Sequence, residues 1–339
     1  MSHDFLAFCG VRDTRQGLNE ADLVLLIRLL SGIAWPEEKA QPRLKLLFRR
    51  LSNIDYGLSE HKDVPVMVNS GNWVPVGQTY VNDCTEAGLF QNELPFAWIP
   101  QDDAGQYCSV LYSIGAHSAA KESVNTNTAS TPLGKYPFVS ALVGLAGVNG
   151  AIVGRYGNVS LTVSLGGYDK SVPKSLLVDD LGNGIVRVLL HKDFAAGDAE
   201  IAQLQDGMVK CMPGVNLRGV DLTDVVERVA VEEVEDREGV QKGQILTVAA
   251  IGSGFDFHCS GPQGNYKVEV KGRSEKGDVT LIGEEPDAAE QWGKNYLLYV
   301  VYNCRSPEPQ LKQATDPAKE WEERNSKSYV IPEKTWSTW

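Results

Sequence analysis

The sequence predicts a multidomain protein of the mixed α/β and α+β classes. Its 339 residues exceed the length of one ordinary domain, and a composition of 42% hydrophobic and 22% charged residues is typical of globular proteins. Helical periodicity dominates residues 1–60, whereas alternating apolar runs separated by glycine turns dominate the remainder. We therefore expect helices and strands that are divided among several domains.

Residues 1–130 form the first predicted segment, a scaffold region of helices and a hairpin. One helix is predicted between Asn19, which can cap it, and Pro36, which ends it, and a second covers residues 42–51. Alternating valines on either side of a Ser-Gly-Asn turn predict a hairpin over residues 64–75.

Residues 131–215 form the second predicted segment, an α+β region. Residues 122–131 are rich in Ser, Thr and Asn, which predicts an exposed loop and places the boundary near residue 130. Beyond this boundary the apolar patterns predict one helix and three strands, at 138–145, 159–165, 175–178 and 185–190.

Residues 216–305 form the third predicted segment, in which the order of elements changes. The patterns predict a helix, three strands, a short strand, a helix and a final strand, at 221–238, 245–251, 254–259, 266–272, 279–282, 286–292 and 296–302. Residues 306–339 are rich in Pro, Glu and Lys, and we interpret them as a C-terminal tail laid on the surface.

Composition excludes several classes of protein. The 6 cysteines and 5 histidines show no CxxC or HExxH spacing, which argues against structural zinc and zinc hydrolases. No apolar run reaches the roughly 20 residues of a membrane span, and the first residues do not resemble a secretory signal, so we expect a cytoplasmic protein with no membrane partner. The net charge of −12 opposes nucleic-acid binding except through a local basic patch.

The chemistry-bearing residues are concentrated in two neighbouring strands, FDFHC and KVEVK. Strand alternation places Asp256 and His258 on one face of the first strand, and Lys267, Glu269 and Lys271 on one face of the second. The SGPQG turn between them predicts a hairpin. Asp256 then lies within reach of Glu269, so two carboxylates and a lysine converge.

This convergence predicts metal-dependent phosphodiester hydrolysis. Carboxylate oxygens suit Mg²⁺ or Mn²⁺, which makes Asp256 and Glu269 candidate metal ligands. Lys271 is a candidate for orienting the attacking water or compensating charge on the phosphate. Alternating charges also describe the solvated face of a hairpin, in which Lys271 is an exposed lysine that contributes little to stability.

Residues from about Leu222 to Asn303, with the blocks GFDF, VEVKG and NYLLYVVYN, resemble the C-terminal domain named after the plant protein NO VEIN. That family belongs to the PD-(D/E)xK restriction-endonuclease-like superfamily. The resemblance implies an αβββαβ core with a mixed sheet, in which Asp256, Glu269 and Lys271 occupy the D, E and K positions. It also implies DNA as the substrate and Mg²⁺ or Mn²⁺ as the cofactor.

Five further residues are candidates for supporting roles. Family members often carry a glutamate in the first helix that extends the metal site, and Glu227 and Glu233 both qualify. His258 is a candidate for touching a phosphate or a metal-bound water, with a hydrogen-bonded strand histidine as the alternative. Lys267 and Arg273 flank the site as candidate contacts to the DNA backbone, with solvated hairpin charges as the alternative.

The blocks GNWVPVGQTYVND, LPFAWIP and VLYSIGAHSAAKESV in residues 71–124 resemble the segment that follows the ATPase module of sacsin-like histidine-kinase-type ATPases. The ATPase signatures themselves do not occur in the sequence. The resemblance implies a separate ATPase or helicase subunit as partner and a restriction or phage-defence role, and enzymes of this superfamily that cut both strands commonly form homodimers. The alternative is a non-catalytic scaffold that retains the nuclease-like fold to bind a nucleic acid or a partner protein.

Overall fold

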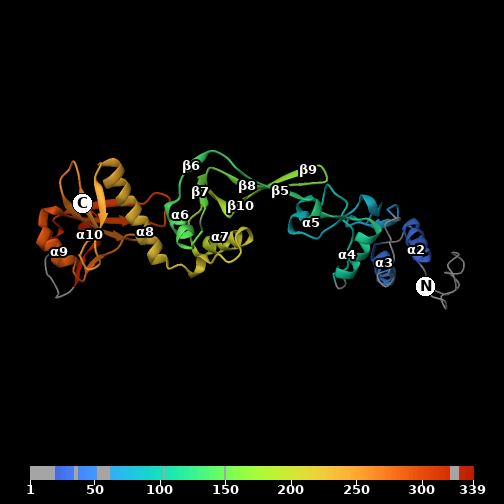
Figure 1. Cartoon of the computed structure of the whole chain (residues 1–339). Helices are drawn as coiled ribbons and strands as arrows, with labels where there is room; N and C mark the ends of the chain where they lie inside the picture. Colours follow the sequence, from blue (N-terminus) through green and yellow to red (C-terminus); the bar gives the residue numbers. More distant parts are fainter. Residues whose placement is uncertain (1–19, 34–36, 52–61, 102–103, 149, 321–327) are drawn as a thin grey trace. The chain divides into compact units, whose positions relative to one another are not determined.

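The computed structural model describes residues 20–33, 37–51, 62–101, 104–148, 150–320 and 328–339, which form two compact units (Figure 1). Unit 1 comprises Met1–Thr126 and Thr162–Val172, and unit 2 comprises Asn127–Leu161 and Pro173–Trp339. The predicted boundaries at 215/216 and 305/306 therefore both fall inside unit 2.

Unit 1 begins with two helices, α2 (Glu20–Gly32) and α3 (Glu37–Leu51). Their leucines at helical spacing are buried in one core with valines of the hairpin formed by β1 (Pro65–Met67) and β2 (Trp73–Pro75). Unit 1 also contains η3 (Val76–Gln78), β3 (Tyr80–Val81), η4 (Thr85–Phe90), α4 (Ala104–Ile114), β4 (His117–Ser118) and α5 (Ala119–Glu122).

The loop predicted over residues 122–131 is largely a strand, β5 (Val124–Ala129). It lies in a sheet of order β5-β8-β9 with β8 (Val159–Leu165) and β9 (Tyr168–Pro173). Thr128 Oγ1 lies 2.8 Å from Ser160 Oγ on the neighbouring strand. The segment is exposed as predicted, but its loop conformation was predicted wrongly, because a strand exposed along nearly all its length shows no apolar alternation in the sequence.

The first part of unit 2 is a four-stranded sheet packed against helices. The sheet has the order β10-β11-β7-β6, and its strands are β6 (Pro132–Gly134), β7 (Ala151–Tyr156), β10 (Leu176–Gly182) and β11 (Ile185–His191). Helices α6 (Pro137–Leu145) and α7 (Asp198–Cys211) contribute apolar side chains to the core against it. The helix and strands predicted in this region are all present.

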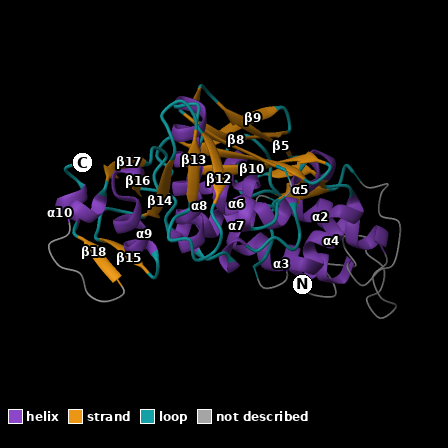
Figure 2. Ribbon diagram, turned by 60° about the vertical axis from the view of Figure 1, so that its left-hand side comes forward, coloured by secondary structure: helices purple, strands orange, loops and turns teal. Residues whose placement is uncertain are grey.

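The C-terminal part of unit 2 is built on a five-stranded mixed sheet of order β12-β13-β14-β16-β17 (Figure 2). Strands β14 and β16 are parallel, and the other neighbours are antiparallel. The strands are β12 (Ile245–Val248), β13 (Phe257–Ser260), β14 (Tyr266–Gly272), β16 (Tyr296–Tyr302) and β17 (Gln310–Thr315).

Two helices cover the two faces of strand β14. Helix α8 (Leu222–Glu235) buries its valines in the same core as Val268 and Val270. At Gly272 an added Cβ would lie 2.8 Å from the carbonyl oxygen of Val226, so glycine permits this close approach of helix and strand. Helix α9 (Glu285–Trp292) packs with Tyr296 on the face that carries Glu269. Both faces of β14 are therefore buried.

The residues predicted as a C-terminal tail are part of the fold. Besides β17, they form η8 (Pro317–Glu320), β18 (Ser328–Ile331), which pairs with β15 (Val279–Ile282), and α10 (Glu333–Trp336). Trp336 is fully buried in a core with Leu298 and Val300 of β16. The polar composition of the segment concealed this role because a few large apolar side chains supply the contacts.

Candidate active site

Asp256 and Glu269 line a cavity of about 440 Å³ beside β14. The other walls are the loop of residues 248–255, which follows β12, and residues 282–285, which lead into α9. Gly254 has a φ of +73°, and an added Cβ would lie 2.5 Å from the carbonyl oxygen of Glu284. A residue with a Cβ would clash here, so glycine at position 254 allows the two walls to meet.

A strand was predicted over residues 254–259, but β13 begins at Phe257. Asp256 therefore lies just before the strand and not within it. Its backbone N–H donates to Val268 O at 2.9 Å, and its Oδ2 accepts from Val270 N–H at 2.8 Å. Burial raises the pKa of this carboxyl, while the Val270 hydrogen bond and Lys271 oppose the shift. The structure thus ties Asp256 to the strand that carries Glu269.

Glu269 is almost completely buried, at 3% exposure, on the face of β14 that α9 covers. Its pKa is raised to about 8, chiefly by burial and also by the carboxylates of Asp256 and Glu285, against the opposing effect of Lys271. The sequence alternative of a solvated hairpin face is therefore wrong at this position. The alternation of charged residues along β14 is typical of a solvent-exposed strand. Here the parallel strand β16 and helix α9 cover β14, so these residues are largely buried.

Lys271 is an ion-pair partner of two carboxylates. Its Nζ lies 2.6 Å from Glu269 Oε1 and 2.7 Å from Glu285 Oε2. Burial alone would lower the pKa of Lys271, but the two glutamates raise it above its usual value. The expectation of an exposed lysine is wrong, because only 17% of the side chain is exposed.

Glu285 is a site residue that the sequence analysis missed. It is the first residue of α9, it also accepts from Ile282 N–H at 2.9 Å, and it lines the cavity. The sequence feature that could have pointed to it is the pair of glutamates directly before Pro286, because proline at the second helical position marks the start of a helix. Strand alternation gave no reason to connect this helix with Lys271.

The donor set fits a hard divalent cation at two carboxylates. Asp256 and Glu269 share one cavity, and oxygen-only ligands suit Mg²⁺ or Mn²⁺, which retain waters. Within the described parts of the chain, no group of three or more His, Cys, Asp or Glu side chains is arranged to hold a metal ion. A cation here would therefore depend on these two carboxylates and on water.

The accessory candidates do not gather at this cavity. Glu227 and Glu233 lie on α8, which packs against the face of β14 opposite to Glu269. His258 is exposed on β13, opposite Lys267 in the strand register, and does not line the cavity. The trio of Asp256, Glu269 and Lys271 is brought together without them.

Both predicted DNA contacts interact with other groups of the protein, and Lys267 is also buried. Lys267 is only 8% exposed, and its Nζ lies 4.6 Å from the ring centre of Phe255 and 4.5 Å from that of Trp292. Arg273 donates from Nε and Nη2 to the carbonyl oxygen of Asp278, at 3.0 and 2.8 Å. Lys267 is therefore not a solvated charge, because two aromatic rings enclose its ammonium.

Part of the chain matches a known protein family. Residues 226–314 match the family described as Protein NO VEIN, C-terminal. This domain extends from α8 to β17 and contains Asp256, Glu269, Lys271 and Glu285. No curated protein and no solved structure matches the chain. No helix among the described residues combines the length and apolarity needed to cross a membrane.

Proposed function

We propose that the NO VEIN C-terminal domain of this chain is a metal-dependent DNA endonuclease of the PD-(D/E)xK type. The observation that carries the proposal is that Asp256 and Glu269 line one cavity while Lys271 is ion-paired with Glu269 beside it, with all three side chains partly or fully buried. Support also comes from the order of α8, β12, β13, β14, α9 and β16, which agrees with an αβββαβ core.

Each residue has a distinct part in this proposal. Asp256 and Glu269 would hold Mg²⁺ or Mn²⁺, which would supply Lewis-acid activation of water and offset negative charge on the phosphate. Lys271 keeps its positive charge because two glutamates raise its pKa, and it orients the water or the scissile phosphate. Glu285 holds the Lys271 ammonium in place from α9.

The acidic charge of the chain, −12, bears on how DNA would reach this site. A protein that repels DNA overall needs a loading partner, so a separate ATPase or helicase subunit, as in a restriction or phage-defence system, is part of the proposal. A homodimer would present two such sites to the two strands. A cytoplasmic location belongs to the same proposal.

The test is a cleavage assay on supercoiled and linear DNA with the full chain, in Mg²⁺ or Mn²⁺ and in EDTA. Asp256→Asn and Lys271→Gln are compared with Glu275→Gln, which changes an exposed glutamate in the turn after β14. We expect metal-dependent nicking that falls by about 100-fold or more in the two site variants and is unchanged in the control. Equal cleavage in all proteins would reject the site assignment.

The second candidate is a non-catalytic scaffold that binds a nucleic acid or a partner protein alongside a separate ATPase. The ion pairs of Lys271 with Glu269 and Glu285 favour it, because they satisfy the lysine without any ligand. A scaffold tolerates Asp256→Asn without loss of biological function, whereas a nuclease does not. Protection of cells against phage by the wild type but not by Asp256→Asn would exclude the scaffold.

A further inference from the structure

A second cavity, of about 290 Å³, lies in the same domain away from the Asp256 site. It is bounded by the turn between β13 and β14, by η7 (Gly293–Asn295) and by β17. None of its lining residues is acidic, and besides Tyr266 its polar lining consists of two lysines and four amide side chains: Lys242, Lys294, Gln263, Asn265, Asn295 and Gln313. We call this cavity the amide pocket.

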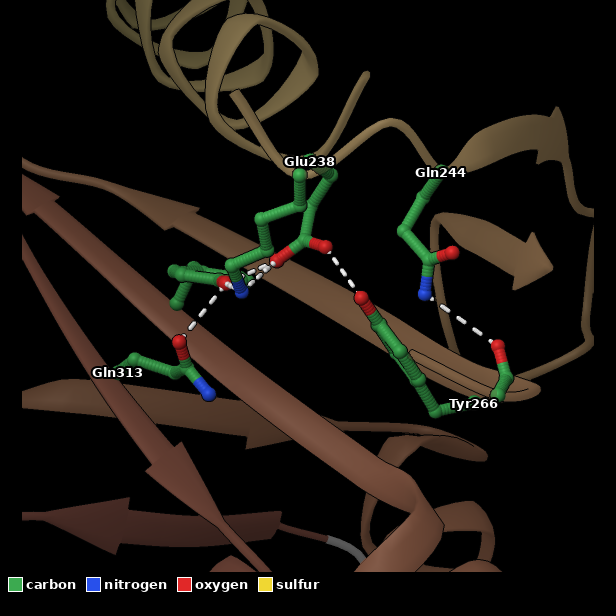
Figure 3. A network of polar contacts seen from close by, with 7 residues as sticks. Glu238, Gln244, Tyr266 and Gln313 are labelled. Atoms are coloured by element: carbon green, nitrogen blue, oxygen red, sulfur yellow. Dashed lines mark hydrogen bonds and ion pairs between the residues drawn. The ribbon is translucent and has the colours of Figure 1, made fainter. Parts of the chain in front are cut away.

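One wall of the amide pocket is held by a buried network (Figure 3). Glu238 is fully buried and accepts from Lys242 Nζ at 2.7 Å and from the hydroxyls of Tyr266 and Tyr299. The Tyr299 hydroxyl oxygen also lies 2.8 Å from the side-chain amide of Gln313, while its one proton is donated to Glu238. The network therefore holds the side-chain amide of Gln313 at the wall of the pocket.

The pocket carries one uncompensated positive charge. Glu238 neutralises Lys242, whereas the structure records no ion pair for the exposed Lys294 within the described residues. The pocket is thus a cationic, amide-lined site in a chain of net charge −12. Its natural ligand is a small anion that also offers hydrogen-bond donors and acceptors.

A nucleotide has this combination of groups. Asn and Gln amides pair with the edges of nucleobases, and a lysine pairs with a phosphate as a point charge. The volume is close to the lower end of small-molecule sites, roughly 300 Å³, which suits one nucleotide and not a larger cofactor. The uncharged Asn265, Asn295 and Gln313 offer donors and acceptors that an inorganic anion alone would not use.

We propose that the amide pocket binds one nucleoside monophosphate unit, with Lys294 on the phosphate and the amides on the base. The unit is either a free mononucleotide or a nucleotide of a DNA strand that has left the base stack. The proposal does not depend on cleavage at Asp256, since no lining residue is shared between the two cavities.

The test measures binding to the full chain by calorimetry in EDTA, where cleavage does not occur. The probes are dAMP, dCMP, dGMP, TMP, inorganic phosphate and a single-stranded oligonucleotide. Lys294→Gln removes the free charge, and Lys334→Gln is the matched control, because it changes an exposed lysine on α10 outside the pocket. Asp256→Asn is measured alongside, to separate this site from the proposed nuclease site.

We expect saturable binding that weakens about tenfold in Lys294→Gln, as for loss of one charge-assisted hydrogen bond, and is unchanged in Lys334→Gln; mononucleotide binding lost in Asp256→Asn but not in Lys294→Gln would place it at the other cavity and overturn the proposal. Binding of mononucleotides identifies free nucleotides as the source, and binding of the oligonucleotide alone identifies a strand. Three further results would overturn the proposal: no binding of any nucleotide, inorganic phosphate bound as tightly as the nucleotides, or an affinity that Lys294→Gln leaves unchanged.

Discussion

Lys271 Nζ lies 2.7 Å from Glu285 Oε2, which joins the lysine of the ExK sequence to the first residue of α9. The same ammonium lies 2.6 Å from Glu269 Oε1 on its own strand. One lysine therefore compensates two carboxylates that lie on different elements and are both largely shielded from water. Its removal has consequences for stability as well as for chemistry.

Lys271→Met should destabilise the C-terminal domain by about 3 kcal/mol, because it leaves Glu269 and Glu285 without their shared cation. Urea unfolding at pH 7 measures the difference from the wild type. Lys334→Met is the control, since it removes an exposed lysine and should change stability by less than about 0.5 kcal/mol. Equal, small effects of both variants would mean that the two ion pairs contribute no net stability.

Glu285→Gln should lower the rate of DNA cleavage by about tenfold while Lys271 stays charged through Glu269. The physical reason is the loss of one charge-assisted hydrogen bond that positions the ammonium. Single-turnover cleavage separates this effect from DNA binding, which should not change. Glu275→Gln, which changes an exposed glutamate outside the cavity, is the control, and Glu285→Asp should restore part of the rate. A variant that cleaves at the wild-type rate would remove Glu285 from the mechanism.

Glu238→Gln should lower the free energy of unfolding at neutral pH. This difference from the wild type should disappear in acid. Burial by itself raises the pKa of Glu238, but hydrogen bonds from Lys242, Tyr266 and Tyr299 bring it below its usual value. A carboxyl with a lowered pKa stabilises the fold above its unfolded pKa of about 4.3, and this contribution is lost as the pH falls through the folded pKa.

The measurement is urea unfolding of both proteins between about pH 3 and pH 7. The free energy of unfolding should differ by about 3 kcal/mol at pH 7, since the variant leaves Lys242 without its buried counter-charge. The gap should narrow below about pH 4. A difference that is constant across this range would show that the charge of Glu238 is not what stabilises the network.

Lys267→Met should leave the salt dependence of DNA binding unchanged. Its ammonium lies between the rings of Phe255 and Trp292 and is shielded from a passing phosphate. Methionine keeps the packing, so we expect a loss of about 1 kcal/mol in stability from the missing cation–π contacts. A salt slope reduced by about one unit would instead restore Lys267 as a phosphate contact.

Local pattern in the sequence was enough to predict most elements of the C-terminal domain. Alternation and β-branched composition placed strands at 266–272, 279–282 and 296–302, where the structure has β14, β15 and β16. Period-2 geometry also places Glu269 and Lys271 on one face of one strand, and the hairpin turn brings Asp256 beside them. These features depend on near neighbours along the chain, and the sequence records them directly.

Tertiary structure alone decided what surrounds those residues. An alternating pattern predicts a strand with one face in solvent. Only the packing of α9 over β14 buries Glu269, encloses Lys267 between aromatic rings and brings Glu285 to Lys271. The role of residues 306–339 was equally hidden. Burial and pairing between distant elements depend on how the whole chain packs, and no periodicity within a strand reports which helix will cover it.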